Sequence, residues 1–135
     1  MLHPINLDVI YNTSNINFSQ GIYDDQSKLI FYSGIVGWDK NLQLTGNGSF
    51  EAQLDQCIIN LKLLLLAQGL DLNSVIKFTI YVVGVTEERR KAIVQMLGNN
   101  FKDYKPANTL IGVASLAREN LLVELDVVAS MSSTH

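Results

Sequence analysis

Two carboxylates near the C-terminus are the residues best suited to chemistry. Glu124 and Asp126 stand in the middle of "NLLVELDVVAS", a run rich in Leu and Val at 120–130. Side chains alternate along a strand, so both acids point to one side, about 7 Å apart. A carboxylate withdrawn from water has a raised pKa and can exchange protons with a substrate or a water molecule. Glu124 is therefore a candidate acid–base group, and a solvated pair at a sheet edge is the ordinary alternative.

The same alternation divides this strand into two unlike faces. The odd-numbered positions are wholly apolar and must face the core, whereas the even-numbered positions mix apolar residues with the two acids. Two helices cannot cover both sides of one sheet, so we expect a second copy of the chain to cover part of the mixed face. The apolar set is Leu121, Val123, Leu125, Val127 and Ala129, and the mixed set is Leu122, Glu124, Asp126 and Val128.

The order of elements predicts one α+β domain over residues 1–135, with two helices packed on one face of a mixed sheet. Ser49 is the expected N-cap of the first helix and Gly69 its stop. Apolar residues at helical spacing, Cys57 among them, form the buried stripe of that helix. The expected elements are a hairpin at 21–36, a helix at 49–69, a strand at 75–83, a helix from Thr86, and strands at 107–113 and 121–130.

Composition excludes several classes of protein. The chain is 47% hydrophobic and 17% charged with a formal net charge of −3, which is typical of a folded domain and lacks the basic footprint of a nucleic-acid binder. A single cysteine, Cys57, and histidines only at His3 and His135 predict no metal site. We expect no secretory signal, no membrane span and a cytoplasmic location.

The segment "KPANTLIGVASLARENLLVELDVVA", Lys105 to Ala129, resembles the C-terminal signature of the RidA/YjgF family, also called endoribonuclease L-PSP or translation-inhibitor-like. "FSQGIYDDQSKLIFYSGIVGWD" and "LKLLLLAQGLDLNSVIKFTIYVV" are similar to two further family segments, so the resemblance covers nearly the whole chain. It implies the chorismate-mutase-like α+β fold, assembled as a homotrimer with three clefts between subunits. It also implies hydrolysis of reactive enamines and imines, such as 2-aminoacrylate, to a 2-oxo acid and ammonia, without a cofactor.

The resemblance assigns roles to particular residues. Glu124 matches the family's cleft Glu, which positions or activates water. Ser33 and Gly34 match its "SG" pair, whose polar groups face the ligand. Two positions depart from the deaminase pattern: Asn108 stands where Arg grips the substrate carboxylate, and Phe18 stands where a Tyr is usual.

The departure at Asn108 removes a positive charge from the expected pocket. If the strand at 107–113 pairs antiparallel with the last strand, Asn108 lies near Glu124 or Asp126, and the cleft is acidic. Lys105 and Arg118 are the nearby cations that could restore a positive charge.

Three functions remain open at this point. The first is a RidA-like hydrolase of enamines or imines that uses Glu124, and the second is a small-molecule-binding protein without catalysis. The third is a ribonuclease or translation inhibitor, which the acidic charge and the lack of aromatics within a basic stripe disfavour.

Overall fold

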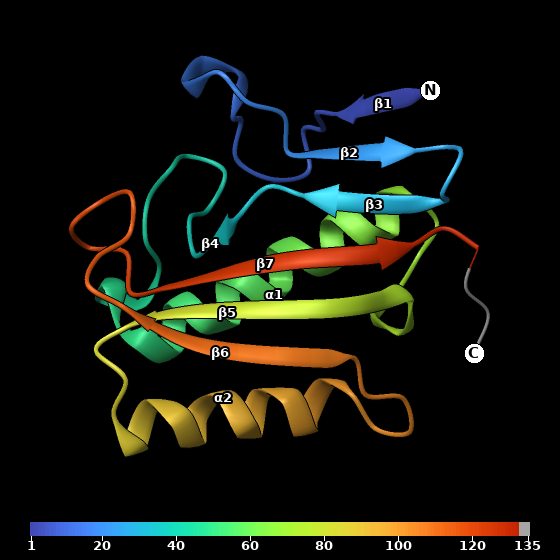
Figure 1. The fold of residues 1–135 in the computed structure, drawn as a ribbon. Helices are drawn as coiled ribbons and strands as arrows, with labels where there is room; N and C mark the ends of the chain where they lie inside the picture. Colours follow the sequence, from blue (N-terminus) through green and yellow to red (C-terminus); the bar gives the residue numbers. More distant parts are fainter. Residues whose placement is uncertain (133–135) are drawn as a thin grey trace.

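The computed structural model describes residues 1–132, so His135 lies outside it. One mixed sheet is covered by two helices, with α1 behind the central strands and α2 along β6 (Figure 1). The predicted α+β class is confirmed. The strands are β1 Leu2–Ile5, β2 Gly21–Asp24, β3 Leu29–Tyr32, β4 Ile35–Val36, β5 Val75–Val83, β6 Ala107–Val113 and β7 Val123–Ser130, and the helices are α1 Phe50–Ala67 and α2 Glu87–Asn100.

The strand order is β1-β2-β3-β7-β5-β6, with β4 beside β7. Every pairing between named strands is antiparallel except the one between β5 and β6. Strand β7 thus runs through the middle of the sheet between β5 on one side and β3 and β4 on the other. No helix in the described part of the chain is long and apolar enough to cross a membrane.

Both helices begin where the sequence predicts. Ser49 Oγ accepts a hydrogen bond from the Ala52 amide at 3.2 Å, and Thr86 Oγ1 accepts one from the Arg89 amide at 3.1 Å. Each cap satisfies an amide that has no partner within the helix. Past the end of α1, Gly69 adopts a left-handed φ of 75° that glycine tolerates best.

The core lies between the helices and one face of the sheet. All five odd-numbered residues of 121–129 are buried, which confirms the predicted division of the last strand. Phe101, which follows α2, packs edge-on against Phe78 of β5 with ring centroids 5.5 Å apart. Cys57 is buried in the same core, as expected for a structural cysteine.

Strand β5 departs from the alternation of inward and outward side chains at its beginning. Counting back from the buried Phe78, strict alternation would place Ile76 inside and Val75 outside, but Val75 is 0% exposed and Ile76 is 39% exposed. The pairing of β5 with β7 shifts register between Val75 and Lys77. An irregularity of this kind inserts one residue, so the residues on its two sides exchange faces.

The predicted neighbour of β6 is wrong. Strand β6 pairs in parallel with β5, and β5 separates it from β7 in the sheet. A strand–helix–strand unit joins parallel neighbours through its helix, and β5, α2 and β6 form such a unit. Asn108 lies opposite Phe78, whose side chain faces the core, so Asn108 is on the helix side and away from Glu124.

A buried amide joins α1 to the beginning of the last strand. Gln53 is 0% exposed, and its Nε2 donates to the carbonyls of Gly48 and Asn120, both at 2.9 Å. Its Oε1 accepts from the Leu122 amide at 2.9 Å. Gly37 lies so close to Gln53 that an added Cβ would be 2.7 Å from the Gln53 Cα. The hydrogen bonds of Gln53 therefore place 120–122 against the helix.

Replacing Gln53 by leucine should lower the free energy of unfolding by about 2 kcal/mol or more, because three partly buried backbone groups lose the hydrogen-bond partner that the buried Gln53 side chain supplies. Urea unfolding measures the change. Gln95→Leu, on the exposed side of α2, is the control and should change stability by about 0.5 kcal/mol or less. Equal effects of the two substitutions would contradict the role given to Gln53.

Candidate functional site

Glu124 lies in the middle of β7 on the face away from the helices. It pairs with Val36 of β4 on one side and with Tyr81 of β5 on the other. The carboxylate is half-buried and accepts no hydrogen bond within residues 1–132. Burial raises the pKa of Glu124, and the negative charge of Asp126 raises it further. A carboxylate of this kind retains its proton to higher pH than usual and has its oxygens open to a ligand.

Gly34 lies directly against the Glu124 carboxylate. A Cβ added to Gly34 would overlap Glu124 Oε2 and lie 2.5 Å from its Cδ. Even alanine at this position would displace the acid. The segment between β3 and β4 therefore touches the proposed acid–base group, and glycine is what permits the contact.

Ser33 is fixed beside Gly34 by two backbone contacts. Its amide donates to the carbonyl of Gln20 at 2.9 Å, and its Oγ donates to the carbonyl of Ser19 at 2.6 Å. Because the hydroxyl proton is engaged, the oxygen offers lone pairs to a ligand. In this arrangement Ser33 can accept a hydrogen bond from an amine or a water molecule.

Phe18 completes this group of residues. It lines a hollow of about 10 Å³ together with Ser33 and Gly34, and its side chain is 44% exposed. That volume suits about one water molecule. The structure thus brings together four of the five predicted site residues, with Glu124 joined to the others through Gly34.

Asn108, the fifth predicted residue, is not part of this group. It lines a separate cavity of about 360 Å³ between α2 and β6, together with Lys105. Within a single chain, Asn108 and Glu124 lie on opposite faces of the sheet. Arg118 lies elsewhere, with its guanidinium 6.0 Å from the ring centre of Trp38.

Sequence reasoning missed Tyr11, which supports the strand beside Glu124. The Tyr11 hydroxyl accepts a hydrogen bond from the Val36 amide at 3.0 Å, and its ring packs edge-on against Trp38 at 5.3 Å. Burial raises the pKa of Tyr11, and the charge of Glu124 adds to the effect. The residue stands in an irregular N-terminal segment, where no periodic pattern marks it as buried.

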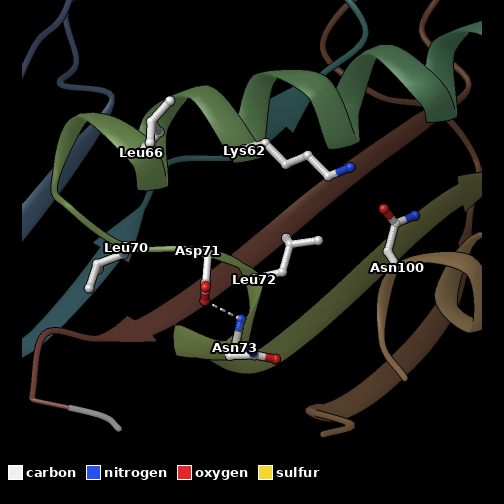
Figure 2. Close-up of a pocket in the computed structure, with 7 residues that line it drawn as sticks. All are labelled: Lys62, Leu66, Leu70, Asp71, Leu72, Asn73 and Asn100. Atoms are coloured by element: carbon white, nitrogen blue, oxygen red, sulfur yellow. Dashed lines mark hydrogen bonds between the residues drawn. The ribbon is translucent and has the colours of Figure 1, made fainter. Parts of the chain in front are cut away.

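A cavity of about 370 Å³ lies at the end of α1, away from the predicted residues (Figure 2). Its polar groups are partly engaged in the fold, since Asp71 accepts a hydrogen bond from the Asn73 amide at 2.9 Å. It contains none of the five predicted residues. The lining residues are Lys62, Leu66, Leu70, Asp71, Leu72, Asn73 and Asn100.

The titration of Glu124 should report its environment directly. Carbon-detected NMR should find its pKa above the ordinary value of about 4.3. Asp126→Asn should lower this pKa only in part, because burial is the larger cause. A wild-type value at or below the ordinary one would contradict the described environment.

The same shift has a consequence for stability. Because the pKa of Glu124 is higher in the folded state than in the unfolded state, its protonation stabilises the fold. This contribution to the free energy of unfolding is fully present below the unfolded-state pKa and is lost as pH rises through the folded-state pKa. Glu124→Gln should therefore raise Tm relative to wild type at about pH 8 more than at about pH 4. Thermal unfolding at both pH values measures this, and an equal effect at both would contradict it.

The chain is similar to proteins of known sequence over most of its length. The family model described as Endoribonuclease L-PSP matches residues 12–131. The protein DfrA of Myxococcus xanthus is 30% identical over 112 residues, covering 83% of each chain. A RutC family protein of Pyrococcus horikoshii is 27% identical over 112 residues, covering 83% of this chain and 85% of its own.

Solved structures show the same fold. The Rid family protein YyfA of Yersinia pestis superposes with a TM-score of 0.86 at 21% identity, covering 97% of this chain and 100% of its own. RidA from an Antarctic Psychrobacter has a TM-score of 0.83 at 23% identity, covering 96% and 99%. The model match spans most of the chain, and the fold agrees with the expected one. The chain belongs to the RidA/YjgF family, whose model bears the name Endoribonuclease L-PSP.

Proposed function

We propose that the chain forms a homotrimer that binds small molecules in clefts between its subunits. The face of the sheet opposite the helices supports this, because large apolar side chains lie there without cover. Phe31 on β3 is 48% exposed and Ile111 on β6 is 39% exposed, and both flank half-buried residues of the central strands. A second copy of the chain would remove this apolar surface from water.

The separation of the predicted residues supports a site made by two copies. Glu124 and Asn108 occupy opposite faces of one sheet, so no small ligand touches both within a single chain. Strand β6 is an edge strand, and the cavity beside it is therefore open to a neighbouring chain. A pocket that holds both residues must combine Glu124 of one subunit with Asn108 of another.

The chemistry that this site would perform is hydrolysis of a reactive enamine or imine. An enamine first takes a proton on carbon to become an imine, and water then adds to the imine carbon. As the water adds, Glu124 would accept one of its protons and pass it to the imine nitrogen, which gives a carbinolamine. Glu124 would then carry the remaining hydroxyl proton to the nitrogen as the C–N bond breaks, so that the products are a 2-oxo compound and ammonia. Ser33 Oγ would accept a hydrogen bond from the water or the amine.

One observation carries this proposal: the half-buried Glu124 carboxylate, with its raised pKa and without a hydrogen bond from the described chain, lies against Gly34, which follows Ser33 in the chain. A group that titrates closer to neutral pH can act in turn as base and as acid. A carboxylate exposed to bulk water would have neither the raised pKa nor the close contact with Gly34.

A binding protein without catalysis is the second candidate. Asn108 supports it, because asparagine carries no charge to hold a substrate carboxylate as arginine does. A ribonuclease is the weakest candidate, because the net charge of −3 gives no general attraction for RNA.

The decay of 2-aminoacrylate, generated in situ and trapped with semicarbazide, tests the hydrolase. Wild-type protein should accelerate the decay, and Glu124→Gln should slow catalysis by about 10²-fold or more because the proton-transfer group is lost. Glu88→Gln, at an exposed position at the start of α2, is the matched control and should retain full activity.

Wild-type decay at the rate of buffer, with 2-aminoacrylate and with larger imino acids, would overturn the hydrolase. Binding of metabolites that raises Tm in wild type but not in Glu124→Ala would then identify the chain as a binding protein.

A further inference from the structure

The cavity between α2 and β6 is lined mostly by apolar residues, and its two polar side chains lie within residues 105–108. Its volume of about 360 Å³ is in the range of small-ligand pockets. Lys105 and Asn108 are the polar side chains among its lining residues; Lys105 lies just before β6, and Asn108 is the second residue of β6. The other lining residues are Val94, Leu97, Gly98, Phe101 and Pro106.

Gly98 lines this cavity without a side chain. It lies in the middle of α2, where glycine weakens a helix relative to alanine. Its φ is not positive, and a Cβ placed on it would meet nothing within 4 Å. Neither the backbone nor the packing requires glycine here, and a larger side chain at this position would enter open space at the cavity.

Lys105 supplies a positive charge that no acidic residue of the described chain pairs with. Its Nζ donates to the carbonyl of Lys102 at 2.7 Å, which leaves two N–H groups of the ammonium for other acceptors. Lys105 forms no ion pair with any residue of 1–132, and the cavity lining contains neither Asp nor Glu. An ammonium beside apolar surface favours an anionic partner, and the Asn108 amide offers further donors.

We propose that this cavity selects carboxylates that bear a branched aliphatic or aromatic side chain. Lys105 and Asn108 hold the carboxylate, while the apolar side chain occupies the space beside Gly98 and Phe101. The inference rests on the proposed function, since it names bulky 2-imino acids as the substrates and the corresponding 2-oxo acids as the products. Lys105 here supplies a charge from a different position than the arginine that the family resemblance implied at 108.

Titration calorimetry with 2-oxo acids tests the selectivity. Wild-type protein should bind 4-methyl-2-oxopentanoate and phenylpyruvate at least about tenfold more tightly than pyruvate, because each buried carbon adds affinity. Lys105→Met should weaken binding of the two larger acids about tenfold or more, because a charged hydrogen bond is lost. Lys102→Met, in the same loop but outside the lining, should bind as wild type does.

A second pair of variants tests whether the apolar side chain of the ligand occupies the cavity beside Gly98. Gly98→Leu should fill part of the cavity and weaken phenylpyruvate binding about tenfold or more, and it should weaken phenylpyruvate binding by a larger factor than pyruvate binding. Gly98→Ala should fold at least as stably as wild type, and circular dichroism of both variants shows whether α2 is intact.

Equal affinity for pyruvate and the larger acids, or full binding by Lys105→Met, would overturn the inference. If the selectivity fails in this way but Glu124-dependent hydrolysis of 2-aminoacrylate is observed, the proposed function stands and only the inference about the cavity is overturned. Selective binding of the larger acids without hydrolysis of any imino acid would overturn the hydrolase and leave the selectivity of the cavity in place.

Discussion

The two sides of β7 are chemically different, and the rest of the structure depends on that difference. One side presents only apolar residues to the helices, all of them buried. The other side presents Glu124 and Asp126 among Leu122 and Val128. Because side chains alternate strictly along a strand, the packing of one side determines which residues stand on the other. A shift of register by one residue would place both acids in the core, which the cost of burying charge forbids.

This arrangement explains how an acid can be half-buried without an ion pair. Glu124 lies in the middle of the sheet, with β4 on one side and β5 on the other, and Gly34 covers part of its carboxylate. Burial without compensation costs stability at neutral pH, which a purely structural residue would have no reason to keep. Tyr11 and Gln53 hold the neighbouring backbone in place through hydrogen bonds, of which the one to Tyr11 is buried and the one to Gln53 partly buried. The fold thus places a partly desolvated acid on a rigid support, which are two features that suit the proposed proton transfer.

The sequence was sufficient wherever a periodic pattern extended over many residues. The caps of both helices and the two faces of β7 followed from spacing and residue type alone. Prediction failed where geometry depends on more distant partners. The irregularity near Val75 breaks the alternation of β5, and the pairing of β6 follows from the path of the chain through α2.

The candidate site could be predicted only in part, and mainly from the family resemblance. Family resemblance identified Glu124, Ser33, Gly34 and Phe18, which the fold brings together. It could not indicate that Asn108 faces the other side of the sheet, because a motif carries no information on strand neighbours. Tyr11 could not be found, because its support of Val36 depends on a contact between residues 25 positions apart in the chain.

Sedimentation equilibrium at micromolar protein concentration tests the central claim most directly, that a neighbouring copy covers the face bearing residue 124. The account predicts a single species with about three times the chain mass of 15.0 kDa. A stable species of 15.0 kDa would leave that acid facing bulk water and would contradict the account.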